Sequence, residues 1–304
     1  MQFSGPGIVS RFFAEIPQSE VDLVVRTAIR GGINWFDTAE MYGWGHSERS
    51  LSAGLRHAGV EPGDVFIATK WSPLARSATS IGRTISERRA ALDPYRVDLH
   101  QIHMGFGSLS PIAAQIRAMA RLADTRTIGA VGVSNFSARQ MERAHAVLAE
   151  RGLALATNQV RVNLLHRTIE SNGVLDAARR LGVTLIAYSP LAGGILTGKF
   201  HANRSLVASM PPLRRLYGFT DVRLNRTLPL IVVLRDIGAA HEVTITQVAL
   251  AWLITTYGDT VIAIPGASKP HHAEEAAGAM FVRLTDDEVA RLDHVSRSLA
   301  GTLR

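Results

Sequence analysis

The stretch VFIATKWSPLARSATSIGRTISERRAALDPYRVDLHQIHM (Val65–Met104) decides the fold class. It places an amphipathic segment, Ala78–Leu92, between two short apolar runs, Val65–Trp71 and Val97–Met104. A strand that is followed by a helix and a second strand pairs in parallel, because a parallel pair needs a crossover connection. The stretch therefore predicts one strand–helix–strand unit of an α/β protein.

The same alternation continues on both sides of this unit. Further strands are predicted at Ile33–Ala39, Ile128–Ser134, Leu155–Val162, Val183–Ser189 and Val261–Pro265. Helices are predicted at Gln18–Arg30, Ser47–Ala58, Pro111–Ala123, Ser137–Arg151, Ile169–Leu181, Leu228–His241, Thr246–Tyr257, Pro270–Ala279 and Asp286–Ser296. Phe200–Arg226 shows no clear period, which predicts a long functional loop.

Seven strands in this pattern are compatible with an open parallel sheet or with a (β/α)8 TIM barrel. We favour the barrel, with its first strand falling in Met1–Ser10, where it is clipped or irregular. No shift in composition marks a linker, so residues 1–304 are expected to form a single domain.

Composition excludes several classes of protein. The chain has no cysteine, which rules out disulfides, thiolate metal sites and a cysteine nucleophile. Its net charge of +7 comes from scattered arginines without a nucleic-acid-binding motif, so we expect no nucleic-acid partner. The longest apolar run, near Leu228–Leu234, is too short to span a membrane, and no leader-like segment is found. We expect a cytoplasmic protein and leave its oligomeric state open.

Lysine is rare in this chain. Lys70, Lys199 and Lys269 are the three lysines among 33 basic residues, which leaves 33 − 3 = 30 arginines. Lysine differs from arginine in being a compact point charge whose pKa shifts readily. Chance would also produce such a distribution, but these three positions are candidates for functional cations.

Four polar side chains fall at or just beyond predicted strand ends: Asp37, Tyr42, Lys70 and His103. Each has a structural alternative, as a turn cap, a loop aromatic, a snorkelling lysine or a core histidine. Because the carboxyl ends of barrel strands meet at one rim, all four are expected to converge there. A metal site is not expected, since His100 and His103 lie on opposite faces of one strand.

These four residue types suit proton transfer to a carbonyl oxygen. A tyrosine has a pKa of ~10, and an ammonium at ~4 Å favours its phenolate by of order 4 kcal/mol at an effective dielectric of ~20. We therefore expect Lys70 to lower the pKa of Tyr42, and Asp37 to keep Lys70 protonated. His103 is expected to donate a hydrogen bond to the substrate oxygen.

Several motifs appear together and in order: FDTAEMYGWGHSE (Phe36–Glu48), ATKW (Ala68–Trp71) and VDLHQIHM (Val97–Met104) come first. GVSNFS (Gly132–Ser137), TNQV (Thr157–Val160), YSPLAGGILTGK (Tyr188–Lys199) and IPGASKPHHAEE (Ile264–Glu275) follow. In this respect the chain resembles the aldo-keto reductase family from about residue 18 to residue 295. The resemblance implies an eight-stranded barrel that binds a nicotinamide cofactor without a Rossmann motif.

The resemblance also assigns roles to residues. It implies a catalytic tetrad of Asp37, Tyr42, Lys70 and His103, with Tyr42 as the acid. It implies cofactor contacts by Ser134, Asn135, Gln159, Tyr188, Ser189, Leu191, Gly193, Gly198, Lys199, Gly266, Ser268, Lys269, His272 and Glu275. Trp44, Trp71 and Met104 are expected to line an apolar substrate pocket, with Phe136 nearby.

The activity that the resemblance implies is reduction of an aldehyde or ketone by a nicotinamide cofactor. Ser268 and Lys269 precede a predicted helix whose N-terminus suits a phosphate, which favours NADP(H) over NAD(H). The family often has arginine where His272 stands, and a Gly-Thr motif ahead of the point where Met1 stands. The alternative reading is a cofactor-binding regulatory subunit that turns over slowly or not at all.

Overall fold

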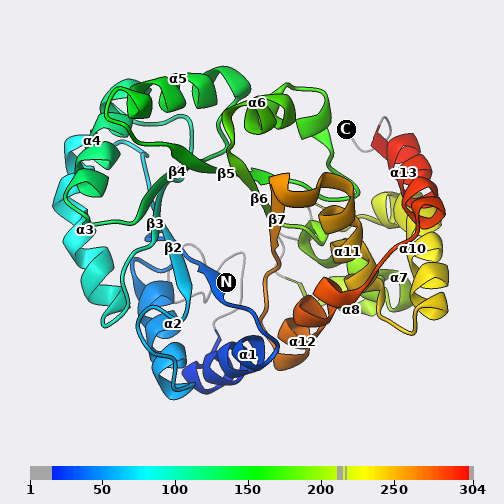
Figure 1. The fold of residues 1–304 in the computed structure, drawn as a ribbon. Helices are drawn as coiled ribbons and strands as arrows, with labels where there is room; N and C mark the ends of the chain where they lie inside the picture. Colours follow the sequence, from blue (N-terminus) through cyan, green and yellow to red (C-terminus); the bar gives the residue numbers. More distant parts are fainter. Residues whose placement is uncertain (1–15, 211–214, 216–217, 301–304) are drawn as a thin grey trace.

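The computed structural model describes residues 16–210, 215 and 218–300, and a parallel sheet curled into a nearly closed barrel lies at its centre (Figure 1). Its strands are β1 (Trp35–Asp37), β2 (Phe66–Trp71), β3 (Leu99–Ile102), β4 (Ala130–Ser134), β5 (Leu155–Arg161), β6 (Thr184–Tyr188) and β7 (Val261–Ile264). Each strand pairs in parallel with the next in sequence. The seven predicted strands are confirmed, and the strand expected within Met1–Ser10 lies outside the described residues.

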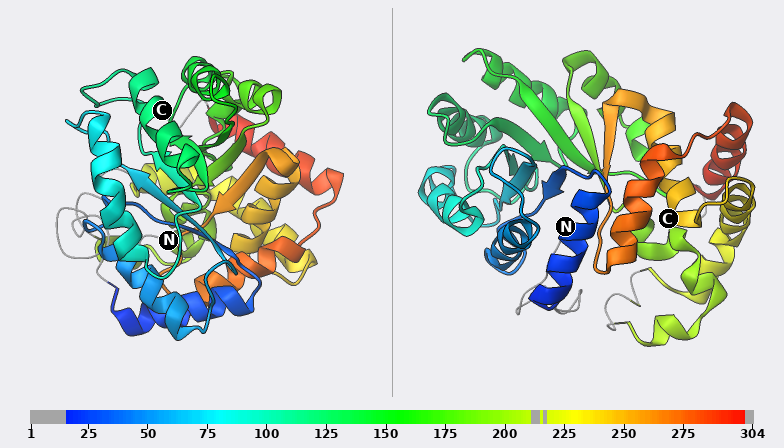
Figure 2. Two further views of the ribbon diagram at one scale, coloured as in Figure 1. Left: turned by 60° about the vertical axis from the view of Figure 1, so that its left-hand side comes forward. Right: turned by 60° about the horizontal axis from the view of Figure 1, so that its bottom comes forward.

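Helices surround the sheet on its outer side (Figures 1 and 2). They are α1 (Gln18–Arg30), α2 (His46–His57), α3 (Thr79–Leu92), α4 (Ile112–Asp124), α5 (Ala138–Ala149), α6 (Val174–Leu181), α7 (Lys199–Ala202), α8 (Ser205–Ala208), α10 (Asp221–Ala240), α11 (Ile245–Tyr257), α12 (Pro270–Gly278) and α13 (Asp286–Ala300). Among the described residues, no single helix is long and apolar enough to cross a membrane; α10 and α11 pass that test only as a pair bent by 95°.

Two predictions about the second half of the chain are wrong. The segment Phe200–Arg226 is not one long loop, because it contains most of α7, all of α8 and the first six residues of α10. α10 begins at Asp221 rather than near Leu228, since the Thr220 side chain accepts a hydrogen bond from the Arg223 backbone N–H and caps the helix. Helices of four residues carry too few apolar positions to show a period.

The barrel interior divides into an apolar end and a polar end. Ala68, Leu99 and Ile186 form a fully buried apolar cluster inside the barrel, and the partly buried rings of Trp35 and Phe66 stack near them at 4.1 Å. Side chains on a strand alternate between its two faces, so the next inward-facing position on each strand lies two residues further on. Several of these next positions carry polar side chains. These are Asp37 on β1, Lys70 on β2, Gln101 on β3 and Gln159 on β5. The sequence thus builds an apolar floor and places polar side chains above it, toward the carboxyl ends of the strands.

Gly132 makes room for this polar layer. It lies on β4 between Gln101 of β3 and Thr157 of β5 in the sheet register. A Cβ atom at this position would lie 2.3 Å from Thr157 Oγ1 and 2.9 Å from Gln101 Cγ. Any side chain here would therefore displace a polar residue of the barrel interior.

The outer ring of helices is continuous even between the described strands β1 and β7, which do not pair with each other. β1 and β7 are the two edges of the sheet, and α1 and α12 lie side by side next to these edges (Figure 2). The close approach depends on Gly31, because a Cβ there would lie 2.5 Å from Ala277 Cβ. Helix packing thus brings the first and last strands of the sheet to the same side of the molecule.

We predict that Gly132→Ala destabilises the fold by about 1–3 kcal/mol, because the added methyl group overpacks the barrel interior. Gly82→Ala is the matched control, since Gly82 lies exposed on α3 with nothing within 4 Å of the added Cβ. That change should stabilise by roughly 0.5–1 kcal/mol through helix propensity. Urea unfolding of both variants measures the difference; equal shifts would contradict the packing argument.

Candidate active site

A buried ion pair lies at the polar end of the barrel. Lys70, fully buried on β2, donates a hydrogen bond to Oδ1 of Asp37, the last residue of β1. Its ammonium also donates to the Thr38 carbonyl oxygen at 2.8 Å. Tyr42 lies in the loop after β1, and His103 follows β3 directly. The structure therefore brings the four residues singled out at the strand ends into one place.

The carboxylate of Asp37 is held by more than the lysine. Its Oδ2 accepts hydrogen bonds from Gln101 Nε2 at 3.1 Å and from Gln159 Nε2 at 2.8 Å. Burial lowers the pKa of Lys70, but Asp37, with smaller contributions from Tyr42 and Glu48, raises it, and together these groups outweigh burial so that the net pKa is raised. Lys70 is therefore an ammonium at neutral pH.

Tyr42 lies between this ammonium and His103. Lys70 Nζ is 5.4 Å from the centroid of the phenol ring, and the imidazole of His103 meets that ring edge-on at 5.8 Å. Burial raises the pKa of Tyr42 and outweighs the opposing effect of Lys70. Our expectation that Lys70 lowers the pKa of Tyr42 is wrong in its net direction, because desolvation of the phenolate is the larger effect.

His103 is neutral in this setting. Burial, together with the positive charge of Lys70, lowers the pKa of the imidazole to about 3. Its Nδ1 is buried and has no hydrogen-bond partner among the residues that the structure describes. A neutral imidazole retains one N–H, so His103 can still donate a hydrogen bond to a ligand oxygen.

A second buried ion cluster supports the loop that carries the phenol. Arg88 of α3 contacts Glu40 Oε2 at 3.1 Å and Glu48 Oε2 at 3.2 Å, and all three residues are at most 5% exposed. Glu48 also accepts a hydrogen bond from Thr69 Oγ1 at 2.6 Å, and Arg76 donates to Glu40. Burial raises the pKa of Glu48, and the charge of Arg88 opposes it. Sequence periodicity gave no sign of this cluster, although the quoted loop motif contains both glutamates.

A cavity of about 870 Å³ opens above the tetrad. Of the predicted site residues, it is lined by Asp37, Tyr42, His103, Met104, Ser134, Asn135, Gln159, Tyr188, Ser189, Leu191, Gly193, Lys199, Gly266, Ser268, Lys269, His272 and Glu275. These residues lie at the ends of β1 and β3 to β7 or in the segments that follow them, so nearly every strand of the barrel contributes. The volume lies in the range of roughly 300–1,000 Å³ that is typical of small-molecule and cofactor sites.

Four predicted residues do not line this cavity. Lys70 lies beneath it, and Gly198 lies in the turn that starts α7. Trp71 does not line the substrate pocket, contrary to our expectation. It is fully buried, and its indole N–H donates to Ser80 Oγ at 3.0 Å, so it belongs to the core under α3. Trp44, which we also expected in the substrate pocket, is 74% exposed and does not line the cavity. Phe136, which we expected near the substrate pocket, is a core residue.

The wall at the ends of β4, β5 and β6 is polar, and hydrogen bonds connect its parts. Ser134 Oγ donates to the Gln159 carbonyl oxygen at 2.9 Å, and the Tyr188 hydroxyl donates to Asn135 Oδ1 at 3.1 Å. Asn135 and Ser189 both have positive φ, at 58° and 50°. Such conformations cost energy in non-glycine residues and are common at binding sites.

The far end of the cavity lies at the N-terminus of α12. Lys269 is the residue before this helix, and its ammonium is 3.4 Å from Glu20 Oε1 of α1. The Ser268 backbone N–H donates to His272 Nδ1 at 3.3 Å. Burial, with the nearby His271 as the next cause, lowers the pKa of His272. Two residues suited to a phosphate therefore lie beside a largely neutral imidazole.

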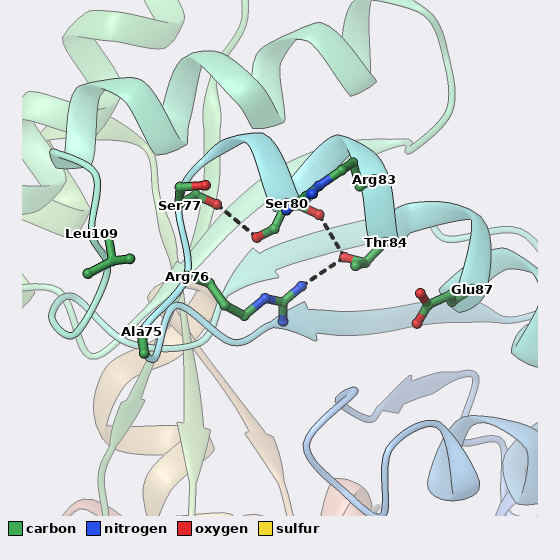
Figure 3. A pocket seen from close by; sticks show the side chains of 8 residues that line it. All are labelled: Ala75, Arg76, Ser77, Ser80, Arg83, Thr84, Glu87 and Leu109. Atoms are coloured by element: carbon green, nitrogen blue, oxygen red, sulfur yellow. Dashed lines mark hydrogen bonds between the residues drawn. The ribbon is translucent and has the colours of Figure 1, made fainter.

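A second cavity, of about 460 Å³, lies away from the barrel mouth over α3 (Figure 3). Its polar side chains have local hydrogen-bond partners: Arg76 donates to Thr84 Oγ1 at 3.0 Å, and Thr84 donates to the Ser80 backbone carbonyl oxygen at 2.9 Å. No predicted site residue lines it. We assign it no ligand.

The chain matches the sequence profile of the Aldo/keto reductase family over residues 2–297. It belongs to that family. Like other aldo/keto reductases, it is therefore a nicotinamide-dependent oxidoreductase that acts on carbonyl groups, on a barrel fold. The expected fold and family are confirmed.

Among aldo/keto reductase relatives, the chloroplastic pyridoxal reductase of Arabidopsis thaliana is 31% identical over 89% of this chain and 74% of its own length. The NADP(+)-labelled aldo-keto reductase yakc of Schizosaccharomyces pombe is 26% identical over 86% of this chain and 78% of its own. The solved structure of a glycerol dehydrogenase from Gluconobacter oxydans superimposes with a TM-score of 0.79 at 27% identity, covering 93% of this chain and 88% of that one.

We predict that Arg88→Met destabilises this aldo/keto reductase by about 3–5 kcal/mol, because it leaves Glu40 and Glu48 buried without their shared cation. Arg83→Met is the matched control, since Arg83 is exposed on the same helix. The control should stay within about 0.5 kcal/mol of the parent. Denaturant unfolding at pH 7 measures both. A small change for Arg88→Met would mean that the cluster does not stabilise the loop.

Proposed function

We propose that this protein reduces an aldehyde or ketone to an alcohol, with NADPH as the electron donor and Tyr42 as the proton donor. The observation that carries the proposal is the position of Tyr42. Its phenol lines the cavity, lies 5.4 Å from the ammonium of Lys70 and is packed against the neutral imidazole of His103. A carbonyl oxygen bound beside Tyr42 and His103 would meet two donors.

The cavity wall fits a dinucleotide cofactor. Gly193 and Gly194 have positive φ of 69° and 104°, and a Cβ on Gly193 would meet only Phe219, at 3.6 Å. A Cβ on Gly266 would meet nothing within 4 Å. Backbone without side chains lets a pyrophosphate approach the peptide N–H groups closely.

Residues on three strand ends would hold the nicotinamide. Ser134, Asn135 and Gln159 offer hydroxyl and amide groups that suit a carboxamide, and Tyr188 offers an aromatic face for stacking. Gln159 Nε2 is bonded to Asp37 Oδ2, so its amide oxygen is the group that remains for a ligand. When bound, the reduced nicotinamide supplies a hydride to the carbonyl carbon.

Residues of the loop after β6 and the N-terminus of α12 would hold the phosphates. Ser189, Leu191, Gly193, Gly198 and Lys199 are assigned to the pyrophosphate, and Gly266, Ser268, Lys269, His272 and Glu275 to the adenosine end. Preference for NADP(H) rests on Ser268 and Lys269 beside a helix N-terminus, since a 2′-phosphate there would meet a hydroxyl and an ammonium. The NADP(+) label on the Schizosaccharomyces pombe relative supports the same choice.

The proton transfer follows from the charges. As negative charge develops on the substrate oxygen, His103 stabilises it by a hydrogen bond and Tyr42 donates the phenolic proton. The tyrosinate that results lies near the Lys70 ammonium, which stabilises it. Asp37 keeps Lys70 charged throughout, and its own hydrogen bonds from Gln101 and Gln159 fix its position.

We predict that Tyr42→Phe lowers kcat for reduction of 4-nitrobenzaldehyde by about 10²–10⁴-fold, because the ring keeps its shape and loses the acidic proton. NADPH oxidation measures the rate. NADPH affinity, measured by quenching of protein fluorescence, should stay within about threefold of wild type, since the hydroxyl is not assigned to the cofactor. Full activity in the variant would refute the acid assignment. Wild-type binding of NADPH without turnover on any carbonyl would favour a regulatory subunit.

We expect kcat/KM for reduction to be flat between about pH 5 and pH 9. The pKa of Tyr42 lies above its ordinary value of 10.0, so the acid stays protonated in this window and is lost only at higher pH. The pKa of His103 is about 3, so the imidazole stays neutral across the window. Initial rates in a constant-ionic-strength buffer series measure the profile. A midpoint near pH 6.5 that disappears in His103→Asn would contradict this assignment.

A further inference from the structure

The segment that follows the cofactor loop is strongly basic. Residues 200–226 contain five arginines and a single acidic residue, Asp221. Asp221 is paired with Arg204 at 3.1 Å. The segment therefore carries a formal net charge of 5 − 1 = +4.

The start of α10 lies beside the wall of the large cavity. Phe219 and Leu224, just before and within the first turn of α10, pack in one apolar cluster with Ile195 and Phe200 from the segment after β6. Phe219 is also the closest neighbour of a Cβ built on Gly193, a cavity-lining residue. Arg223 lies between these two residues in the sequence, at the point where α10 begins beside the cavity wall.

Arg161 approaches from the opposite element. It is the last residue of β5, two residues beyond Gln159 and hence on the same inward face of the strand. Its register partner on β6 is Tyr188, which lines the cavity. Burial raises the pKa of the Tyr188 hydroxyl and the charge of Arg161 opposes it, so the two groups lie within electrostatic reach.

The two guanidinium groups lie near each other without a counter-charge. Burial, followed by the charge of Arg161, lowers the pKa of Arg223. Neither arginine forms an ion pair within residues 16–210, 215 and 218–300, and Arg223 Nε is buried there without an acceptor. The rest of the chain contains one acidic side chain, Glu15. Arg161 is exposed, whereas the buried Nε of Arg223 lacks an acceptor beside this like charge, and an anion bound there would satisfy the donor and offset the repulsion.

We propose that Arg161 and Arg223 recognise an anionic group on the substrate, so that the carbonyl compounds this protein reduces carry a carboxylate or a phosphate. The inference rests on the proposed carbonyl reduction and specifies its substrate class. A planar guanidinium pairs with either anion through two parallel N–H donors, and a pair of them at a cavity mouth also attracts anions from solution. The nearby His166 does not add to the charge, because burial and Arg161 lower its pKa.

The test compares two aldehydes of the same shape, 4-carboxybenzaldehyde and methyl 4-formylbenzoate, with saturating NADPH. We expect wild type to prefer the carboxylate in kcat/KM by about tenfold, and Arg161→Met and Arg223→Met each to remove most of that preference. Reduction of the methyl ester should stay within about twofold in both variants, which also shows that they are folded. Arg235→Met is the matched control, because it removes an exposed charge about 18 Å further along α10. The carboxylate preference of this variant should equal that of wild type.

Two further measurements separate the possible outcomes. The carboxylate preference of wild type should fall as NaCl is raised from about 20 mM to about 500 mM, because salt screens charges at a cavity mouth. NADPH affinity, measured by fluorescence quenching, should be unchanged in both variants. Weakened NADPH binding with an unchanged preference would mean that the arginines serve the cofactor phosphates, and would overturn the inference. Equal rates on both aldehydes in wild type would also overturn it while leaving carbonyl reduction intact, whereas absence of turnover on either would refute carbonyl reduction itself.

Discussion

The ion pair between Lys70 and Asp37 is the interaction on which the rest of the site depends. Taking an ammonium and a carboxylate out of water costs several kcal/mol per ion unless hydrogen bonds satisfy what remains of each group. Here the ammonium also donates to the Thr38 carbonyl oxygen, and the carboxylate accepts from Gln101 and Gln159. Those partners come from β3, β5 and the end of β1, so the pair requires the barrel to curl. The curl of the sheet and the charged site are thus one structural requirement.

Desolvation and charge act in opposite directions on the phenol above this pair. Burial raises the pKa of Tyr42 and the ammonium of Lys70 lowers it, and burial prevails. For an acid in a reduction this balance is useful, because the proton stays on the phenol until negative charge develops beside it. If the effect of the Lys70 ammonium were much larger than that of burial, Tyr42 would be a tyrosinate at neutral pH, which suits a base in the reverse reaction. The neutral His103 adds a donor without adding a charge that would shift this balance.

The sequence predicted the features that follow from period and order. The predicted helix Gln18–Arg30 coincides with α1, and the four strand-end residues converge as the barrel rule requires. Trp71 was misplaced although the signal was present: if Lys70 faces inward, its neighbour on the strand must face outward. Gln101 and the cluster of Arg88 with the two loop glutamates could not be found in this way. Their roles depend on which side chains meet in the interior, and a one-dimensional pattern does not contain that information.

The architecture also separates what must stay fixed from what can vary. The polar layer is set by side chains on the strands, and it fits because Gly132 leaves space between Gln101 and Thr157. A larger residue at that position would move groups that hold Asp37. The wall of the cavity beyond the strand ends is instead formed by segments such as the one after β6, which packs against the start of α10 through a small apolar cluster. Charge can be added or removed at the mouth without disturbing the ion pair below. In the function that we propose, the barrel interior determines proton transfer, while Arg161 and Arg223 beside the cavity select the substrate.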